Sequence, residues 1–243
     1  MKSLALLMLM LVAGSFAETA IPPGTILPVQ LNSSLRSAKA RPGQTITARI
    51  MQDVPLGGHQ KIHVGARVLG RVLAVKPATA SQAAELSLRF DTVVDHKRRI
   101  SIVTNLRAIA TMMDVAEAQT PDSGPDRGTP EVYWTTDLIG GEVAYGASAV
   151  AHGSDVVGHS LLSGGVLLRV SSAPGTKCRG EFPDNDRPQA MWVFSSDACG
   201  VYDFPNLILT HEGRTDPLGE IILSSTKGNF DLRAGSGMLL RVH

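Results

Sequence analysis

Short segments that alternate apolar and polar residues, separated at close intervals by glycine or proline, constrain the fold of this chain most. Examples are Thr45–Ile50, Leu86–Phe90 and Ile100–Val103. A period of two places alternate side chains on opposite faces of an extended strand, and the intervening turns suit antiparallel neighbours. The pattern predicts an all-β fold of antiparallel strands, arranged as a barrel or as a sandwich.

The alternation lapses between residues 112 and 130, where Gln119–Gly128 contains only polar and turn-forming residues. We interpret residues 112–130 as a flexible loop or linker. It would separate an N-terminal β lobe, residues 18–111, from a C-terminal β lobe, residues 131–243. The pattern leaves open whether the two lobes form one domain.

Residues 1–17 have the order of a cleavable signal peptide. Lys2 supplies a positive start, Leu4–Val12 is apolar, and Ser15 and Ala17 are small residues at the two positions that a signal peptidase reads. An apolar run of about 10 residues is too short for a bilayer core, which needs about 20. We therefore expect a mature chain near Glu18 that is periplasmic or extracellular, or associated with the outer membrane, without a transmembrane helix.

The charge balance of the mature chain names no partner. Cleavage removes Lys2, so Lys+Arg falls from 23 to 22 against 22 Asp+Glu, and only 5% of the residues are aromatic. A nucleic-acid-binding chain would carry a basic excess with interleaved aromatic residues. The basic run His96–Arg99 is typical of an exposed hairpin turn. We expect no nucleic acid and instead an envelope protein or a cell-wall component as partner; the oligomeric state is not indicated.

Two cysteines, Cys178 and Cys199, lie in the exported part of the chain. Thiols of exported proteins meet oxidants, so the pattern predicts one disulfide. Closing a loop of this length would stabilise the fold by roughly 3 kcal/mol. The alternative is a two-cysteine metal site, but no histidine lies between the cysteines to complete it.

Two pairs of segments repeat within the chain. Gly65–Leu73 matches Gly153–Leu161 at both glycines, a valine and a leucine, and Gly165–Val170 nearly repeats as Gly237–Val242. One interpretation is that the lobes reuse a strand-turn-strand unit; the other is chance similarity between strands rich in glycine, valine and leucine. For Val143–Leu162 a helix is the alternative, which its three internal glycines disfavour.

Three consecutive segments carry a family resemblance. Ile21–Leu31 contains Pro-x-Gly-Thr, Pro42–Ile50 places a Pro-Gly turn before a strand, and His63–Val72 holds two spaced glycines. Within residues 21–75 this order resembles the periplasmic β-barrel domain of the TrbI-like subunit of type IV secretion and conjugation channels. The resemblance implies a β scaffold in an envelope protein. The transmembrane helix and Pro-rich tether of that family have no counterpart here.

No motif predicts a catalytic residue, a cofactor or a metal site. Ser224–Lys227 has Ser-x-x-Lys spacing, but it follows a strand where a helix is needed, and Gly235–Gly237 lacks the full serine-hydrolase elbow. His59 and His63 have a helical metal spacing inside a predicted strand, where they would lie about 13 Å apart. His211–Glu212 is interpreted as a loop pair.

Aromatic residues offer the one candidate binding surface. Trp192, Phe194 and Tyr202 flank Cys199, and they form either an apolar cluster against the disulfide or an exposed platform for a glycan or peptidoglycan. Tyr133–Trp134 would serve the same purpose or anchor the loop. The sequence thus favours a non-enzymatic structural or binding module of the cell envelope; the alternative is a secreted hydrolase of cell-wall or polymer substrates whose site is not located.

Overall fold

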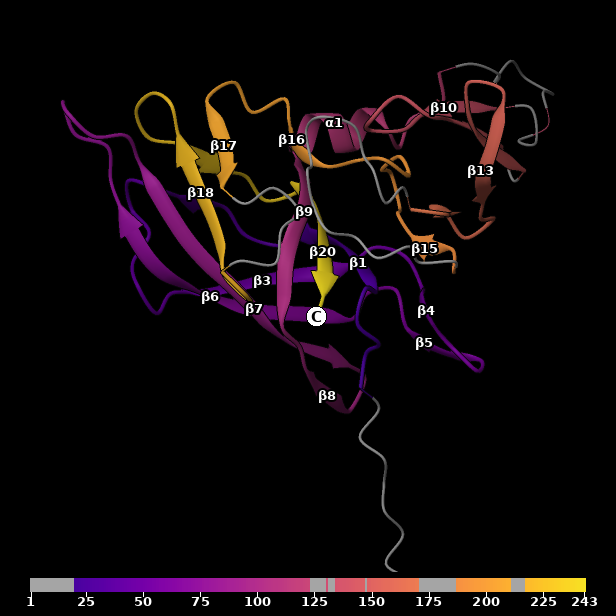
Figure 1. The fold of residues 1–243 in the computed structure, drawn as a ribbon, viewed down its shortest axis with the longest axis horizontal. Coiled ribbons are helices and arrows are strands. Elements are labelled where there is room, and N and C mark those ends of the chain that lie inside the picture. Colours follow the sequence, from indigo (N-terminus) through magenta and orange to yellow (C-terminus); the bar gives the residue numbers. More distant parts are fainter. Residues whose placement is uncertain (1–19, 123–129, 131–133, 147, 171–186, 211–216) are drawn as a thin grey trace, which may run out of the picture.

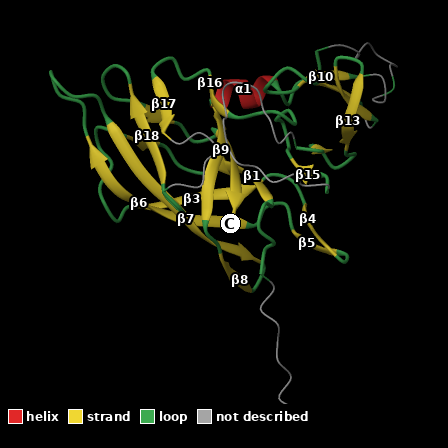
Figure 2. Cartoon of the chain, viewed as in Figure 1, coloured by secondary structure: helices red, strands yellow, loops and turns green. Residues whose placement is uncertain are grey.

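The computed structural model describes residues 20–122, 130, 134–146, 148–170, 187–210 and 217–243. Within these ranges the chain consists of strands and one short helix, α1, Met112–Glu117 (Figure 2). The predicted all-β class is confirmed. The predicted signal peptide lies outside the described residues. No helix in the described ranges is long and apolar enough to cross a membrane.

A large sheet of ten strands forms the main body of the molecule (Figure 1). Its order is β16-β9-β20-β1-β3-β6-β7-β18-β17, with β8 paired to β7, and the ladder is not closed. All neighbours are antiparallel except the parallel pair β16 and β9. The strands are β1 Ile26–Leu31, β3 Thr45–Ile50, β6 Arg67–Lys76, β7 Glu85–Asp95, β8 Arg98–Ser101, β9 Thr104–Ala110, β16 Gly200–Tyr202, β17 Leu207–Thr210, β18 Ile221–Ser225 and β20 Gly237–Val242.

A smaller sheet of six antiparallel strands lies beside the large one and runs in chain order (Figure 1). Two short ribbons, β2 with β19 and β4 with β5, complete the fold. The strands of the small sheet are β10 Thr135–Asp137, β11 Val143–Tyr145, β12 Ala149–His152, β13 Asp155–Ser160, β14 Val166–Leu168 and β15 Gln189–Ala190. The ribbons are β2 Leu35–Arg36, β4 Val54–Gly57, β5 Gln60–Ile62 and β19 Asp231–Leu232.

The predicted boundary at residues 112–130 does not coincide with the division between the sheets. Strands β16, β18 and β20 come after it, yet they pair with strands that come before it, and β17 extends the same sheet through β18. Strand β20, for example, pairs Arg241 with Ile26 of β1. The physical reason is that open edges of the N-terminal strands must be paired or covered. The boundary region itself begins with α1, which Thr111 and Asp114 cap reciprocally.

Burial explains why some strands alternate and others do not. In Thr45–Ile50 exposed and buried residues alternate, as predicted. In β20 every residue is buried, because the two faces of this strand belong to different cores. Met238 and Leu240 join the core of the large sheet, whereas Leu239 joins a second core beneath the small sheet. The second core therefore fixes one sheet against the other.

The glycines shared by Gly65–Leu73 and Gly153–Leu161 occupy equivalent local geometries. Gly65 and Gly153 both have positive φ. At Gly70 in β6 and Gly158 in β13, an added Cβ would overlap a carbonyl oxygen of the neighbouring strand. The pairing nevertheless differs, because β14 pairs with β13 whereas β20 pairs with β1 and β9. The local strand-turn geometry recurs, but the arrangement of the repeated strands does not.

Candidate functional site

A pocket of about 410 Å³ opens beside the small sheet, where that sheet meets the end of α1 and the turn after β3. This volume is in the range of small-molecule sites. We call it the inter-sheet pocket. Its lining residues are Met51, Ala118, Gln119, Pro121, Trp134, Thr136, Leu138, Ala144, Gly146, Ser160, Leu161, Leu162, Ser163, Gly164, Gly165, Val166, Trp192 and Val193.

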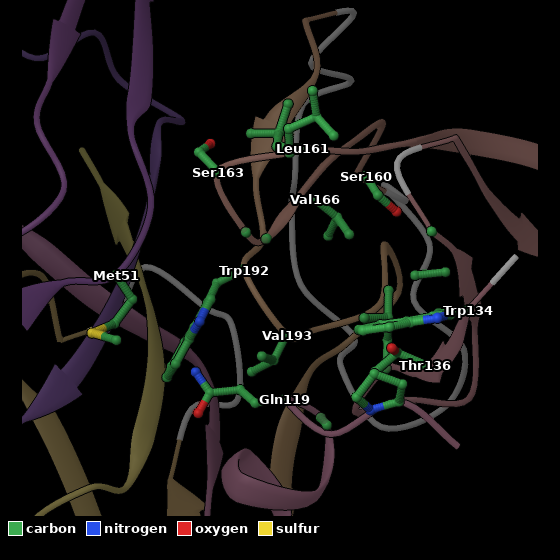
Figure 3. Close-up of a pocket in the computed structure, with 18 residues that line it drawn as sticks. Met51, Gln119, Trp134, Thr136, Ser160, Leu161, Ser163, Val166, Trp192 and Val193 are labelled. Carbon is green, nitrogen blue, oxygen red and sulfur yellow. The ribbon is translucent and has the colours of Figure 1, made fainter. Parts of the chain in front are cut away.

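Two tryptophans face this pocket from opposite sides. Trp192 lies with Met51 on one side, and Trp134 lies with Thr136 and Ser160 on the other (Figure 3). Because the chain contains two tryptophans, both of its indole rings belong to this site. Indole rings offer flat apolar area at a low cost in conformational entropy.

The lining carries no ionisable side chain among the residues described there. Its polar side chains are those of Gln119, Thr136, Ser160 and Ser163. The Ser160 hydroxyl is buried and has no hydrogen-bond partner within the described part of the chain. An apolar and aromatic surface with a few neutral polar groups suits an uncharged ligand.

Trp192 is held in an unusual backbone conformation. Its φ is 54°, in the left-handed region that a bulky residue rarely adopts. Its side chain is buried, and its ring contributes to the second core as well as to the pocket wall. A strained backbone of this kind costs about 1–3 kcal/mol and persists only where the surroundings hold it.

Gln52 supplies much of that restraint. Its side chain is buried, and Oε1 accepts hydrogen bonds from the backbone N–H groups of Trp192 at 2.8 Å and Val166 at 3.2 Å. Its Nε2 donates to the carbonyl oxygen of Val166 at 2.9 Å. One amide therefore links the turn after β3 to β14 and to the Trp192 segment, and it fixes two walls of the pocket.

Trp134 is positioned by the small sheet. It precedes β10, and its carbonyl oxygen accepts a hydrogen bond from the backbone N–H of Gly146 at 2.6 Å. Its neighbour Tyr133 lies outside the described residues, so its predicted role is not tested. Trp134 itself is half-buried in the pocket wall, and its predicted purpose, a ligand surface or an anchor, stays a prediction.

The three aromatic residues predicted to bind together do not form one exposed surface. Trp192 is 4% exposed, Phe194 is fully buried, and Tyr202 is partly buried. The rings of Phe194 and Tyr202 meet edge to face at 6.5 Å, which corresponds to the predicted apolar cluster. Only Trp192 of the three lines the inter-sheet pocket.

The cysteines are only partly placed. Cys199 is 1% exposed, and its backbone N–H donates to the Tyr202 hydroxyl at 3.0 Å. Burial raises the pKa of that hydroxyl. Cys178 lies outside the described residues, so the Cys178–Cys199 disulfide stays a prediction.

The structure separates the other histidines and serines that the sequence singled out. His59 lies in the turn between β4 and β5, whereas the His63 ring contacts Asp95 and His96. Ser224 lies within strand β18, which runs to Ser225, whereas the sequence places it just after the strand. The turn predicted at His96–Arg99 is present, because β7 ends at Asp95 and β8 begins at Arg98. His211–Glu212 lies outside the described residues.

No match to this chain is found among protein-family models, curated proteins or solved structures. The resemblance of residues 21–75 to TrbI-like channel subunits stays a prediction.

One cluster has the residue types of a hydrolytic triad but not its geometry. Glu142 is fully buried; it accepts a hydrogen bond from the Ser196 hydroxyl and lies 3.4 Å from Nδ1 of His152. In a triad the histidine stands between the serine and the carboxylate, so that it can take the hydroxyl proton. Here the carboxylate stands between the other two, and Ser196 is not activated by His152.

A second, shallower pocket of about 240 Å³ is acidic. Asp114 and Asp203 both line it. Burial and the neighbouring Asp203 carboxyl raise the pKa of Asp114, against the opposing effect of Thr111. Two neighbouring carboxyl groups, one of them with a raised pKa, are a recurring acid-base arrangement.

The Asp114 carboxyl makes stability depend on pH. The pKa of Asp114 is higher in the folded chain than in the unfolded chain, so ionisation of this carboxyl lowers the free energy of unfolding. The loss is complete above the folded pKa, and it is absent below the unfolded pKa of about 3.9. We expect Asp203→Asn to raise the free energy of unfolding at pH 7 by roughly 0.5 kcal/mol, the scale of an exposed charge pair. Asparagine also tolerates the φ of 51° at position 203.

Urea unfolding at pH 7 and pH 4 measures this effect. The stability difference between Asp203→Asn and the wild-type chain should shrink as the pH falls towards the unfolded pKa, since the Asp114 carboxyl then takes up a proton and its repulsion by Asp203 is lost. A difference of equal size at the two pH values would show that the carboxyl pair is not its source.

Proposed function

We propose that this chain is an exported, non-enzymatic protein of the cell envelope that binds a neutral glycan in the inter-sheet pocket. The observation that carries the proposal is that Trp134 and Trp192, from segments far apart in the sequence, line one pocket. Its described lining residues include no ionisable side chain. The pocket forms where the small sheet packs against the turn after β3 of the large sheet, so both sheets contribute to the site.

The chemistry of the lining favours a saccharide. The C–H face of a pyranose ring is apolar and packs on an indole ring, while its hydroxyl groups need neutral hydrogen-bonding partners. Gln119, Thr136, Ser160 and Ser163 offer such partners. A phosphate or carboxylate ligand would be desolvated there without a counter-charge, which is unfavourable.

The same lining favours binding over catalysis. General acid-base chemistry needs a titratable group within hydrogen-bond reach of the substrate. Thr136, Ser160 and Ser163 carry the hydroxyl groups of the inter-sheet pocket, and among the lining residues that the structure describes no histidine, aspartate, glutamate or lysine accompanies them. A hydroxyl group without a base is a poor nucleophile.

The compartment rests on the sequence. The signal-peptide pattern of residues 1–17 and the proposed Cys178–Cys199 disulfide both suit an oxidising space outside the cytoplasm. An envelope location would bring the pocket to cell-wall glycans, which are the class of ligand its chemistry suits. The resemblance to TrbI-like subunits is consistent with an envelope scaffold, and it does not indicate which ligand the chain binds.

A fluorescence titration tests the proposal. Because both tryptophans line the pocket, an N-acetylglucosamine oligomer is expected to change the intrinsic emission of the mature chain in a saturable way. Trp134→Ala should weaken binding about 30-fold, the scale of an aromatic anchor in a central contact.

Tyr145→Ala is the matched control for that variant. Tyr145 is 44% exposed on the neighbouring strand β11 and does not line the inter-sheet pocket, so its removal should leave affinity unchanged. Equal affinity in Trp134→Ala and wild type, or no saturable change with the oligomer at all, would sink the glycan proposal.

The second candidate function, hydrolysis of a cell-wall polymer, is favoured by the Asp114 and Asp203 pair in the acidic pocket. A general acid with a raised pKa is what glycoside hydrolysis requires. Digestion of peptidoglycan by the mature chain, lost in Asp114→Asn, would establish this function in place of simple binding.

A further inference from the structure

Three side chains with metal-ligating groups meet at one end of the large sheet. Nδ1 of His63 lies 3.1 Å from both carboxylate oxygens of Asp95, and Nε2 of His96 lies 3.8 Å from Oδ1 of Asp95. One ligand atom from each residue lies within 4.8 Å of the others. Among the residues that the structure describes, no other group of three histidine, cysteine or acidic side chains lies so close.

The backbone explains why these residues converge. Asp95 is the last residue of β7 and His96 is the first of the turn to β8. Strand β6 pairs with β7 at Arg67 and Val94, so the loop before β6 must lie beside Asp95. A turn there, closed by the hydrogen bond from Ala66 N–H to the His63 carbonyl oxygen at 3.1 Å, places His63 over the carboxylate.

His96 is presented by a backbone that few residues adopt. Its φ is 53°, the left-handed region in which histidine is one of the more tolerated side chains. The His63 and His96 rings meet edge to face at 4.8 Å between centroids. Their side chains are 41% and 72% exposed, whereas that of Asp95 is 1% exposed. A hydrated cation would therefore reach the two exposed imidazoles from solvent and contact the buried carboxylate from the side on which the imidazoles lie.

We propose that His63, Asp95 and His96 bind a divalent transition metal of the zinc type. Two imidazoles and one carboxylate are a common donor set for such ions, and three protein ligands leave a coordination position open to water. The three ligand atoms lie within 4.8 Å of one another, so rotation of the exposed rings can bring them to the zinc distances of about 2.1 Å. The metal would replace the hydrogen bond between His63 and Asp95.

Arg98 sets the mode of carboxylate binding. Its Nη2 donates to Oδ2 of Asp95 at 2.7 Å, and Oδ1, which lies 3.1 Å from His63 and 3.8 Å from His96, is the oxygen that would bind the metal. The site is thus monodentate at Asp95, and the guanidinium charge opposes the cation and limits its affinity. A bound metal would link the loop after β5 to the turn between β7 and β8 and hold two exposed connections together.

Zinc titration of the untagged mature chain tests the site. We expect one equivalent of Zn²⁺ to bind by calorimetry and to raise the melting temperature. His96→Asn, which removes a ligand and keeps a residue that accepts positive φ, should weaken zinc binding at least about tenfold. Its melting temperature without zinc should match the wild type.

His59→Asn is the matched control. His59 is also exposed and also has positive φ, 64°, but it lies in the β4–β5 turn outside the cluster. His63→Asn is a second test, because its amide retains the hydrogen bond to Asp95 without an imidazole ligand. Absence of zinc binding, wild-type affinity in both ligand variants, or equal weakening in His59→Asn would overturn the proposal.

Discussion

Replacing Gln52 by alanine is expected to lower the free energy of unfolding by about 3 kcal/mol. The side chain is buried and makes three hydrogen bonds to the backbone of Val166 and Trp192. Alanine would leave the N–H groups of Val166 and Trp192 buried without that acceptor, and each such group costs about 1–3 kcal/mol. The Val166 carbonyl oxygen would keep its hydrogen bond from the Met191 N–H. Water entering the new cavity would recover part of the loss.

Gln82→Ala is the control for this measurement. Gln82 is exposed, and its backbone carbonyl oxygen rather than its side chain accepts a hydrogen bond from Thr79. Urea unfolding should show a large loss for Gln52→Ala and a change within about 0.5 kcal/mol for Gln82→Ala. Glycan affinity should fall with Gln52→Ala, because Trp192 loses its restraint. Similar stability of the two variants would mean that Gln52 does not join the sheets.

The second large effect is expected at the repeated glycines. A Cβ at Gly70 would overlap the Arg89 carbonyl oxygen and lie 2.9 Å from Cδ1 of Phe90. A Cβ at Gly158 would likewise overlap the Leu167 carbonyl oxygen and lie 2.7 Å from Cδ2 of Leu168. The opposing atoms are backbone, so the strands themselves must separate. We expect Gly70→Ala and Gly158→Ala each to destabilise the chain by about 3 kcal/mol.

Gly65→Ala separates crowding from backbone preference. Gly65 has a φ of 86° but open space around its Cβ position, so alanine there should cost only about 1 kcal/mol. Denaturant unfolding of the three variants would give this ranking. If Gly65→Ala were as damaging as Gly70→Ala, conformational preference and not the close approach of strands would explain the glycines.

The strands that face solvent on one side could be predicted from the sequence. For strands that are buried on both faces, the sequence did not indicate which neighbours they pair with. Thr45–Ile50 alternates in sequence and in burial. For Gly237–Val242 the sequence shows only a near repeat of Gly165–Val170. Its pairing could not be predicted, because its neighbours β1 and β9 lie more than 100 residues away in the sequence. Local periodicity reports which faces are apolar, and it carries no information on which distant edge a strand will cover.

The candidate sites show the same limit. Trp192 was identified from its aromatic neighbours, but Phe194 turned inward because the second core occupies that face. Gln52 gave no signal, since an isolated glutamine after a strand is ordinarily exposed. The sequence spacing suggests a pair of His63 with His59. In the structure the His63 ring instead contacts Asp95, which lies 32 residues further along the chain. The one sequence feature that could have indicated the metal site is the Asp95–His96 pair at the start of a predicted hairpin turn.

We propose one glycan site between the two indole rings. The most direct measurement is a titration of ¹⁵N-labelled mature chain with an N-acetylglucosamine oligomer, followed through the indole N–H resonances. The chain should give two such resonances, since it has two tryptophans, and both are expected to shift together with one dissociation constant. Indole resonances that stay in place at saturating oligomer, or a shift of one alone, would contradict the account.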